Sequence, residues 1–473
     1  MKRRNIPIIQ LFAIVVVLFQ YLITLNNDAG YTTVLTVELL IIYGVLLAKS
    51  IKGRGWFDLY TLLLIMMGLF SYGEIAFSFI DSSVNYRVAS IGIELDFKEI
   101  TVQKACLIYC AYMLALDIGI SVFQKEDRYY NHYHVPFNID AYKVGMWLLF
   151  VFAAFAFYRA FMQYRMLSAN RLLLFKGGSQ GLDLPMYIRI TSTFFLIGYY
   201  IFTASKPPLK QFLIATAVYI LVQIPDLMVG NRMSLGVLLV YLVWMMVSVY
   251  EYKVKMSRLL LPVIVVVLIF QYIGMSRVEM ETTGIGSVGL IIRFLTMQAT
   301  SFGLLCTFIQ YTPNLSGPYP FVFDSLIGGL TGYTGQSEEL MLHRANIGHQ
   351  LVYEISPDYY FAGQSSGTSC VTELYEFGIF GVIIGAIVLA YMIYFIQKNF
   401  NKNRMLLLFS YIIFSTIVTS PRAGMFVPLY QIIRTLGFAW VAFAVYGLFT
   451  GHAVHLFGWF KNIKIGEYNN EKS

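Results

Sequence analysis

Two short segments of the sequence place an arginine where a predicted helix begins. They are "VGNRMSL" (229–235), which contains Arg232, and "SPRAGMF" (420–426), which contains Arg422. The first turn of a helix presents unpaired N–H groups and a positive dipole end, which favour an anion. A guanidinium adds a permanent charge and a planar set of donors that matches phosphate. The two arginines predict a diphosphate-binding site, although each one alone also suits an anchor at a membrane surface.

A long polar segment, "HQLVYEISPDYYFAGQSSGTSC" (349–370), precedes Glu373 and the next apolar run. Histidine is the side chain whose ordinary pKa suits proton transfer near neutral pH. We expect His349 to accept the proton of an attacking hydroxyl group, and Glu373 to be the second catalytic residue. Glu354 and Asp358 are competing bases, and a plain surface role is the alternative for a single histidine in a loop.

Three further arginines are assigned to the same diphosphate site. Arg277 and Arg344 lie in a long segment between apolar runs, and Arg434 lies inside the last apolar run. An unpaired guanidinium in hydrocarbon is costly, so Arg434 should face the bundle interior or a wet cavity. A structural ion pair is the alternative to a ligand contact, with these acids of other apolar runs as candidate partners: Glu38, Glu74 and Asp117.

Another arginine-bearing segment, "FYRAFMQYRMLSANRLLLFK" (157–176), carries Arg159, Arg165 and Arg171 at a spacing of six residues. This spacing does not place the three on one helical face. Arginine mixed with leucine, methionine and aromatic residues suits a segment at the headgroups beside an anionic lipid. Plain membrane anchoring is the alternative.

The elements that must position these side chains are largely apolar. Of 473 residues, 58% are hydrophobic and 13% are charged, whereas about a quarter of a soluble protein is charged. Apolar runs of about twenty residues recur, which is the length that crosses a bilayer. The sequence therefore predicts an all-α fold, a polytopic transmembrane helix bundle of about 12 spans. These are 6–25, 33–50, 57–80, 100–123, 141–162, 187–204, 209–227, 233–250, 259–275, 375–397, 405–419 and 427–449.

The distribution of lysine and arginine sets the orientation of these spans. Threading twelve spans places 14 of the 17 lysines, and both termini, on one side, which is then the cytoplasm. Of the 17 arginines, 11 fall outside or within the spans, which favours binding of phosphate on the external face.

Three divisions of the chain follow from this topology. Residues 1–275 form transmembrane helices 1–9, residues 276–373 form one large external loop with short amphipathic helices, and residues 374–473 form helices 10–12 and a cytoplasmic tail. Within the loop, the apolar run 290–311 is interrupted by polar residues. We expect it to be an amphipathic or re-entrant helix that lies on the external surface.

Several catalytic motifs do not occur in the sequence. It contains no P-loop and no H-E-x-x-H motif. We expect no metal, no cofactor and no nucleic-acid partner. A substrate that arrives within the membrane is favoured over a soluble activated sugar.

The topology and two motifs resemble the Wzy-type polymerases, which join the repeat units of O-antigen or capsular oligosaccharides. The motifs are "GQSSGTS" running through "ELYEFGIFGVIIG", and "SPRAG" two helices later. The resemblance implies a lipid-linked, C-type glycosyltransferase that needs no metal and acts at the outer face of the bacterial cytoplasmic membrane. Donor and acceptor would be undecaprenyl-diphosphate oligosaccharides, with a chain-length regulator and a flippase as further partners.

Two alternative functions remain open on the sequence. An O-antigen ligase differs only in the acceptor, and the ligases carry a histidine followed by a spaced glycine motif. Here His349 and Gln350 are followed by Gly363 and by Gly367–Thr368, with wider spacing. A polysaccharide flippase or other secondary transporter is the other alternative, but the chain shows no pair of related halves, which such transporters usually have.

Overall fold

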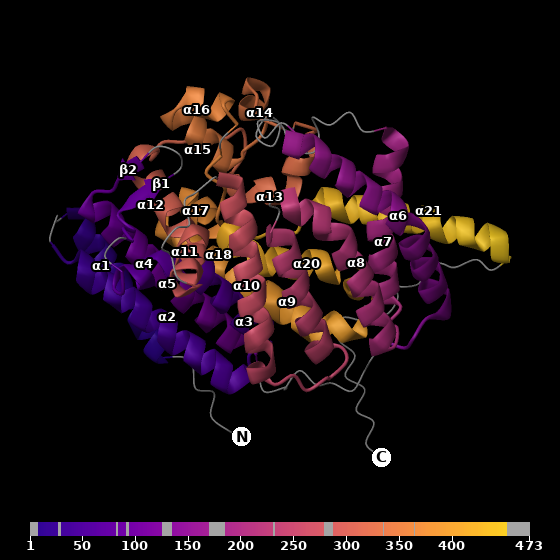
Figure 1. The fold of residues 1–473 in the computed structure, drawn as a ribbon. Coiled ribbons are helices and arrows are strands. Elements are labelled where there is room, and N and C mark those ends of the chain that lie inside the picture. The colour runs from indigo at the N-terminus through magenta and orange to yellow at the C-terminus, as the bar shows by residue number, and fades with distance from the viewer. Residues whose placement is uncertain are drawn as a thin grey trace, which may run out of the picture.

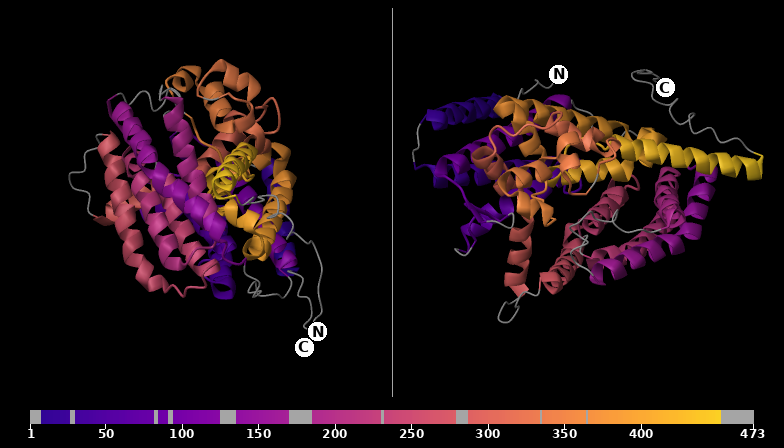
Figure 2. Two further views of the ribbon diagram at one scale, coloured as in Figure 1. Left: turned by 90° about the vertical axis from the view of Figure 1, so that its right-hand side faces the viewer. Right: turned by 90° about the horizontal axis from the view of Figure 1, so that it is seen from above.

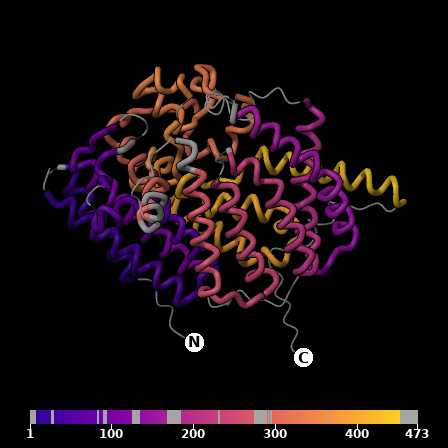
Figure 3. Tube along the Cα trace, in the orientation of Figure 1, coloured from indigo at the N-terminus to yellow at the C-terminus, as the bar shows by residue number. Residues whose placement is uncertain are grey.

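The computed structural model describes residues 8–26, 30–81, 84–90, 94–124, 135–169, 185–229, 232–278, 287–333, 335–363 and 365–451. Within these ranges the regular structure is helical except for one antiparallel pair of strands, β1 (Val88–Ser90) and β2 (Glu94–Asp96). The helices pack side by side into one bundle (Figures 1 and 3). The all-α prediction is therefore confirmed.

Each predicted apolar run is helical in the structure. Nine described helices are long and apolar enough to cross a membrane. The helices at the predicted runs 187–204, 233–250 and 405–419 do not meet that standard, so the count of twelve spans stays a prediction. The helices are α1 (Ile8–Asn26), α2 (Thr32–Arg54), α3 (Leu59–Met67) continued by the π-helix η1 (Gly68–Tyr72) and α4 (Gly73–Ser78), α5 (Glu99–Phe123), α6 (Ile139–Ala169), α7 (Met186–Ala204), α8 (Leu209–Val229), α9 (Arg232–Ser248), α10 (Met256–Val278), α18 (Gly378–Asn399), α19 (Arg404–Leu408), α20 (Ser410–Thr419) and α21 (Leu429–Thr450).

Short helices follow one another between α10 and α18. Of these, α14, α15 and α16 gather at one end of the bundle, at the top of Figure 1. The short elements are α11 (Ser287–Gln298), α12 (Ser301–Tyr311), η4 (Phe321–Phe323), α13 (Asp324–Ile327), η5 (Gly328–Leu330), α14 (Glu338–His343), α15 (Ile347–Ile355), α16 (Pro357–Phe361), α17 (Cys370–Leu374), η6 (Tyr375–Phe377) and, later in the chain, η7 (Phe400–Lys402) and η8 (Ser420–Arg422).

The segment 290–311 differs from its prediction. It forms two helices, and residues 301–308 of α12 are buried, so the expected position on the external surface is wrong for this part. Phe302 and Leu305 join the main core, and Ser301 accepts a hydrogen bond at its carbonyl from the Tyr109 hydroxyl at 3.2 Å. The apolar side chains of α12 pack into the core, and the Thr307 hydroxyl is satisfied by the Gly303 carbonyl at 2.8 Å, so burial leaves this polar group paired.

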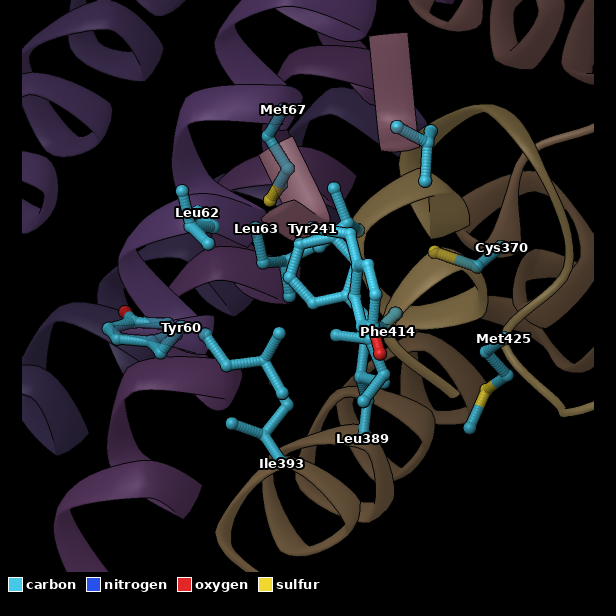
Figure 4. Packing of buried hydrophobic residues seen from close by; sticks show 14 of the residues in the cluster. Tyr60, Leu62, Leu63, Met67, Tyr241, Cys370, Leu389, Ile393, Phe414 and Met425 are labelled. Atoms are coloured by element: carbon cyan, nitrogen blue, oxygen red, sulfur yellow. The ribbon is translucent and has the colours of Figure 1, made fainter. Parts of the chain in front are cut away.

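The core lies where helices from both halves of the chain meet. Tyr60 and Met67 of α3, Tyr241 of α9, Leu389 of α18 and Phe414 of α20 pack together in its centre (Figure 4). To one side, α6, α7 and α8 form a layer, and α21 runs past this layer (Figure 2). This arrangement brings the start of α21 close to the short helices, because α21 also packs against α13 and η5.

Candidate functional site

Asp324, the first residue of α13, is the centre of a polar cluster at the short helices. Its Oδ1 accepts hydrogen bonds from Arg344 Nε at 2.9 Å and from the Tyr319 hydroxyl at 3.0 Å. Its Oδ2 accepts from Arg344 Nη2 at 3.2 Å and from Asn346 Nδ2 at 2.9 Å. The Asp324 side chain is 6% exposed and the Arg344 side chain 22%. A bidentate pair of this kind is among the stronger protein hydrogen-bond arrangements.

The predicted ligand Arg344 thus holds an ion pair with Asp324, whose role the sequence did not indicate. This cluster fixes the start of α15, because the Asn346 side chain caps the helix by accepting from the His349 backbone N–H at 3.2 Å. Gln350 Nε2 donates to the Arg344 carbonyl at 2.9 Å. The cap and the ion pair together hold His349 in the first turn of α15.

His349 is a weaker base in this environment than the sequence suggested. Burial, and to a smaller extent the charge of Arg344, lower the pKa of His349 to about 4, although Asp324 opposes this. Its Nδ1 is buried without a hydrogen-bond partner in the structure, and its ring meets the edge of Tyr360 with centroids 5.8 Å apart. The expectation that its ordinary pKa would suit proton transfer near neutral pH is therefore wrong.

Glu373 in α17 is the second predicted catalytic residue, and it is 2% exposed. Its Oε1 accepts a hydrogen bond from the Thr368 hydroxyl at 2.8 Å, whereas no described residue donates a hydrogen bond to Oε2. A buried carboxylate oxygen without a donor is unusual and marks a functional candidate. Gly424 covers this oxygen, since a Cβ at position 424 would lie 3.0 Å from it and 2.6 Å from Ser325 Oγ.

A contact between two glycines joins His349 to Glu373. A Cβ on Gly348 would overlap the carbonyl of Gly367, and the Ser366 backbone N–H donates to the Gly348 carbonyl at 3.1 Å. His349 directly follows Gly348, and Thr368, which holds Glu373, directly follows Gly367. The structure therefore brings the two predicted catalytic residues into one cluster, with the charge of Asp324 acting on both.

Arg422 ends η8, two residues before Gly424. Its Nη1 donates to Gln298 Oε1 at 2.7 Å, and its guanidinium lies over the ring of Phe70 in the π-helix η1, 5.6 Å from the centroid. Arg232 begins α9, and its Nη1 donates to the Phe270 carbonyl at 2.9 Å. Burial, followed by the charge of Arg232, lowers the pKa of Arg422. The two predicted anion ligands thus lie near enough for their charges to interact.

A family model for the O-antigen polysaccharide polymerase Wzy matches residues 6–451 of the chain. The chain belongs to this family. It is a multi-pass membrane protein that polymerises lipid-linked repeat units into polysaccharide. No curated protein and no solved structure matches the chain in the other two comparisons.

The remaining predicted arginines of the polymerase, Arg277 and Arg434, lie in α10 and α21. Arg277 lies in the last turn of α10, and its side chain lies outside the described residues. Arg434 lies in α21 with its guanidinium over the ring of Tyr430, 5.4 Å from the centroid. Its charge acts on Arg159 in α6.

The acids named as partners of Arg434 have other contacts in the polymerase. Asp117 forms an ion pair with Lys49 at 2.6 Å, and Glu38 accepts a hydrogen bond from Gln20 at 3.1 Å. Glu74 lies in α4, and no contact between it and Arg434 is seen in the described part of the chain. Asp226 of α8 is an acid whose charge, like that of Arg434, acts on Arg159, and it was not among the predicted partners of Arg434.

Proposed function

We propose that the polymerase is a metal-independent glycosyltransferase that joins undecaprenyl-diphosphate-linked repeat units at the outer face of the bacterial cytoplasmic membrane. One observation carries the proposal: the turn 420–426 holds Arg422 at one end and packs Gly424 against Glu373 Oε2. The turn thus carries a cation for the leaving group and contacts the carboxyl group of Glu373 in α17. A chain-length regulator and a flippase are the partners expected to work with it.

The proposed reaction is a single displacement at the anomeric carbon of the donor. The acceptor hydroxyl oxygen forms the new bond to this carbon while the bond from the carbon to the phosphate oxygen breaks. The hydroxyl proton passes to a base, and undecaprenyl diphosphate leaves with the electron pair. Because the diphosphate is a good leaving group, the enzyme mainly has to stabilise its developing negative charge.

Arg422 and Arg232 supply that stabilisation in this proposal. Their guanidinium groups carry permanent charge, and each can offer two parallel N–H donors to phosphate oxygens. The Arg422 bond described above is to the Gln298 amide rather than to a carboxylate. Arg344, by contrast, is given a positioning role, because its guanidinium is bound to Asp324. Arg277 remains a candidate ligand.

Glu373 is the base that we propose, with His349 as a neutral neighbour of the acceptor sugar. Burial raises the pKa of Glu373 to about 8, so its ionised carboxyl group is a stronger base than an exposed carboxylate, whereas burial lowers the pKa of His349 to about 4. No hydrogen-bond partner of Glu373 Oε2 is seen among the described residues. Because Gly424 covers Oε2, the turn 420–426 has to shift before an acceptor hydroxyl reaches the carboxylate. Binding of the donor diphosphate by Arg422, on the same turn, would supply that movement.

The test uses purified polymerase in vesicles with synthetic lipid-linked repeat units, with polymer length followed on gels. The wild type should extend chains equally with and without EDTA. Arg422→Lys and Arg232→Lys keep the charge but lose the bidentate geometry, so we expect each to lower the rate about 10- to 100-fold. Glu373→Gln should lower it about 100- to 10,000-fold.

Arg87→Lys is the matched control, because Arg87 is a half-exposed arginine that pairs with Glu99 at 3.5 Å, outside this cluster. Its rate should equal that of the wild type. Polymer formation that requires a divalent cation, or a Glu373→Gln variant with normal rates, would contradict the proposal. Transfer of finished polymer to a second acceptor, without chain extension, would indicate the ligase instead.

A further inference from the structure

A second group of arginines lies between α6, α7, α8 and α21. Arg159 Nη1 donates to the Ser192 hydroxyl at 2.8 Å. The charges of Arg189, Arg434 and Asp226 act on Arg159, so three cations and one anion are gathered here. Ser192 and Arg189 come from α7, Asp226 from α8 and Arg434 from α21. The helices contact one another, with α7 packed against α6, α8 and α21.

The members of this arginine group lie near helix ends that the predicted topology places outside the cell. Arg189 is in the first turn of α7, Asp226 in the last turn of α8 and Arg434 in the second turn of α21. Arg159 lies in the second half of α6. The predicted topology therefore places the group at the same membrane face as the reaction cluster.

Arg434 has capacity for a ligand. Its Nε is buried and has no hydrogen-bond partner among the described residues, and the face of its guanidinium rests on Tyr430. Arg189 is exposed, and Arg159 and Asp226 are partly exposed, so the group is accessible from the surface. Unfilled guanidinium donors beside excess positive charge favour a multiply charged anion such as a diphosphate.

The start of α21 joins this group to the reaction cluster. A Cβ at Gly329 of η5 would lie 3.3 Å from Tyr430 Cβ, and η5 directly follows α13, which begins at Asp324. Tyr430 is 44% exposed and lies one helical turn before Arg434. A substrate that extends from Glu373 to the second arginine group would therefore pass along Tyr430, whose ring is suited to packing against a sugar face.

The chemistry of polymerisation requires two lipid diphosphates at different distances from the base. The donor breaks its bond to diphosphate, so that diphosphate must lie at the reaction centre. The acceptor attacks through a hydroxyl of its sugar and keeps its own diphosphate at the other end of the repeat unit. The acceptor diphosphate is consequently separated from the base by the repeat unit.

We propose that Arg159, Arg189 and Arg434 bind the diphosphate of the acceptor, whereas Arg232 and Arg422 bind that of the donor. This inference rests on the proposed function. The sequence assigned Arg434 to the same diphosphate site as Arg232 and Arg422. In this inference Arg434 belongs instead to a second diphosphate site, at the far end of the acceptor. A phosphate group of a membrane phospholipid has the same chemistry, so the experiment has to distinguish the two sources.

Two half-substrates separate the sites in purified polymerase. A donor-only repeat unit has hydrogen in place of the accepting hydroxyl, and an acceptor-only unit has a methylene group in place of the oxygen between sugar and phosphate. Arg159→Gln, Arg189→Gln and Arg434→Gln should each raise the KM for the acceptor-only unit about tenfold or more and leave that for the donor-only unit unchanged. Arg422→Lys should affect the donor-only unit instead.

Arg87→Gln serves as the matched control and should change neither KM. Arg189→Gln covers the risk of misfolding, because Arg189 is exposed and its loss removes no buried contact. Repeating the series in vesicles with increasing phosphatidylglycerol identifies the ligand. A KM for the acceptor that rises only in the variants, at every lipid composition, supports the inference.

Four results would overturn it. Unchanged acceptor KM values in all three variants, or a rate that follows the phosphatidylglycerol content through these arginines, would make the group a phospholipid anchor. Absence of any transfer between the half-substrates by the wild type would overturn the proposed function and this inference together. Transfer that persists with a changed donor KM would overturn this inference alone.

Discussion

Gly424 lies against Glu373 so closely that a Cβ at position 424 would be 3.0 Å from the carboxylate Oε2. The same Cβ would overlap Ser325, whose hydroxyl accepts a hydrogen bond from the Phe426 backbone N–H at 3.3 Å. The turn 420–426 is thus fitted between the carboxylate and α13. Space here, rather than backbone conformation, requires glycine, because Gly424 is not among the residues with positive φ.

Replacing Gly424 by alanine should displace this turn. Overpacking of this kind costs about 1–3 kcal/mol, and we expect Gly424→Ala to lower both the melting temperature and the rate of chain extension. The double variant Ser325→Gly, Gly424→Ala should recover activity, since the side chain that clashes is gone. Ser325→Gly alone controls for the lost hydrogen bond to Phe426. A fully active Gly424→Ala variant would show that the contact is loose.

His349 should make the stability of the protein depend on pH. Its pKa is lowered by burial from an ordinary value of 6.5 to about 4. The unfolded chain therefore takes up a proton below about pH 6.5 while the folded chain does not. Stability falls as the pH drops from about 6.5 to 4, by up to about 2–3 kcal/mol from this residue, and no further below.

The measurement is thermal unfolding at pH 7 and pH 4.5 for the wild type and for His349→Gln. The wild type should lose more stability than the variant between these two values. The rate of chain extension should show no titration of His349 near neutral pH. Equal losses in the two proteins would contradict the buried, neutral state of the histidine.

The Asp324–Arg344 pair should show strong coupling in a double-mutant cycle. Removing one partner leaves the other charge partly buried and unpaired, so Asp324→Ala and Arg344→Ala should each cost about 1–3 kcal/mol of stability. The double variant should cost less than the sum of the two. Additive effects would show that the two residues are not coupled. An Arg344→Ala variant that loses diphosphate binding while its stability is unchanged would show that Arg344 contacts substrate directly.

Single cysteines test the predicted orientation. All four native cysteines are buried, which keeps the background labelling low. Cysteine in place of the exposed Ser316 or Ser365 should react with an impermeant thiol reagent in intact cells, whereas cysteine in place of the exposed Lys398 should react only after the cells are opened. Labelling of Lys398→Cys alone in intact cells would reverse the orientation.

Local features of the sequence were enough to predict the long helices. A run of about twenty apolar residues is helical in a membrane because its backbone must satisfy its own hydrogen bonds. The run 290–311 was misplaced because its interrupting residues suggested a surface, yet polar groups such as Thr307 are satisfied within α12 by bonding to the Gly303 carbonyl at 2.8 Å.

Long-range contacts account for what the sequence did not predict. Arg344 and Asp324 are 20 residues apart with no local pattern that relates them. The charges that act on Arg159 come from α7, α8 and α21, and this proximity exists only after the helices pack. The pKa of His349 likewise depends on burial, which a loop sequence does not indicate. The contact between Gly348 and Gly367 links the segments of His349 and Glu373, whereas the catalytic roles of these two residues stay a prediction.

The cover that Gly424 places over Glu373 Oε2 has a consequence for side reactions with water. A glycosyl diphosphate is open to hydrolysis, and an exposed carboxylate beside it would activate water as readily as a sugar hydroxyl. Each such event would release a finished chain from its lipid and end its growth. A base that stays shielded until the substrates are seated avoids this loss. In a polymerase, the fit of one glycine would then help to set how long the chains become.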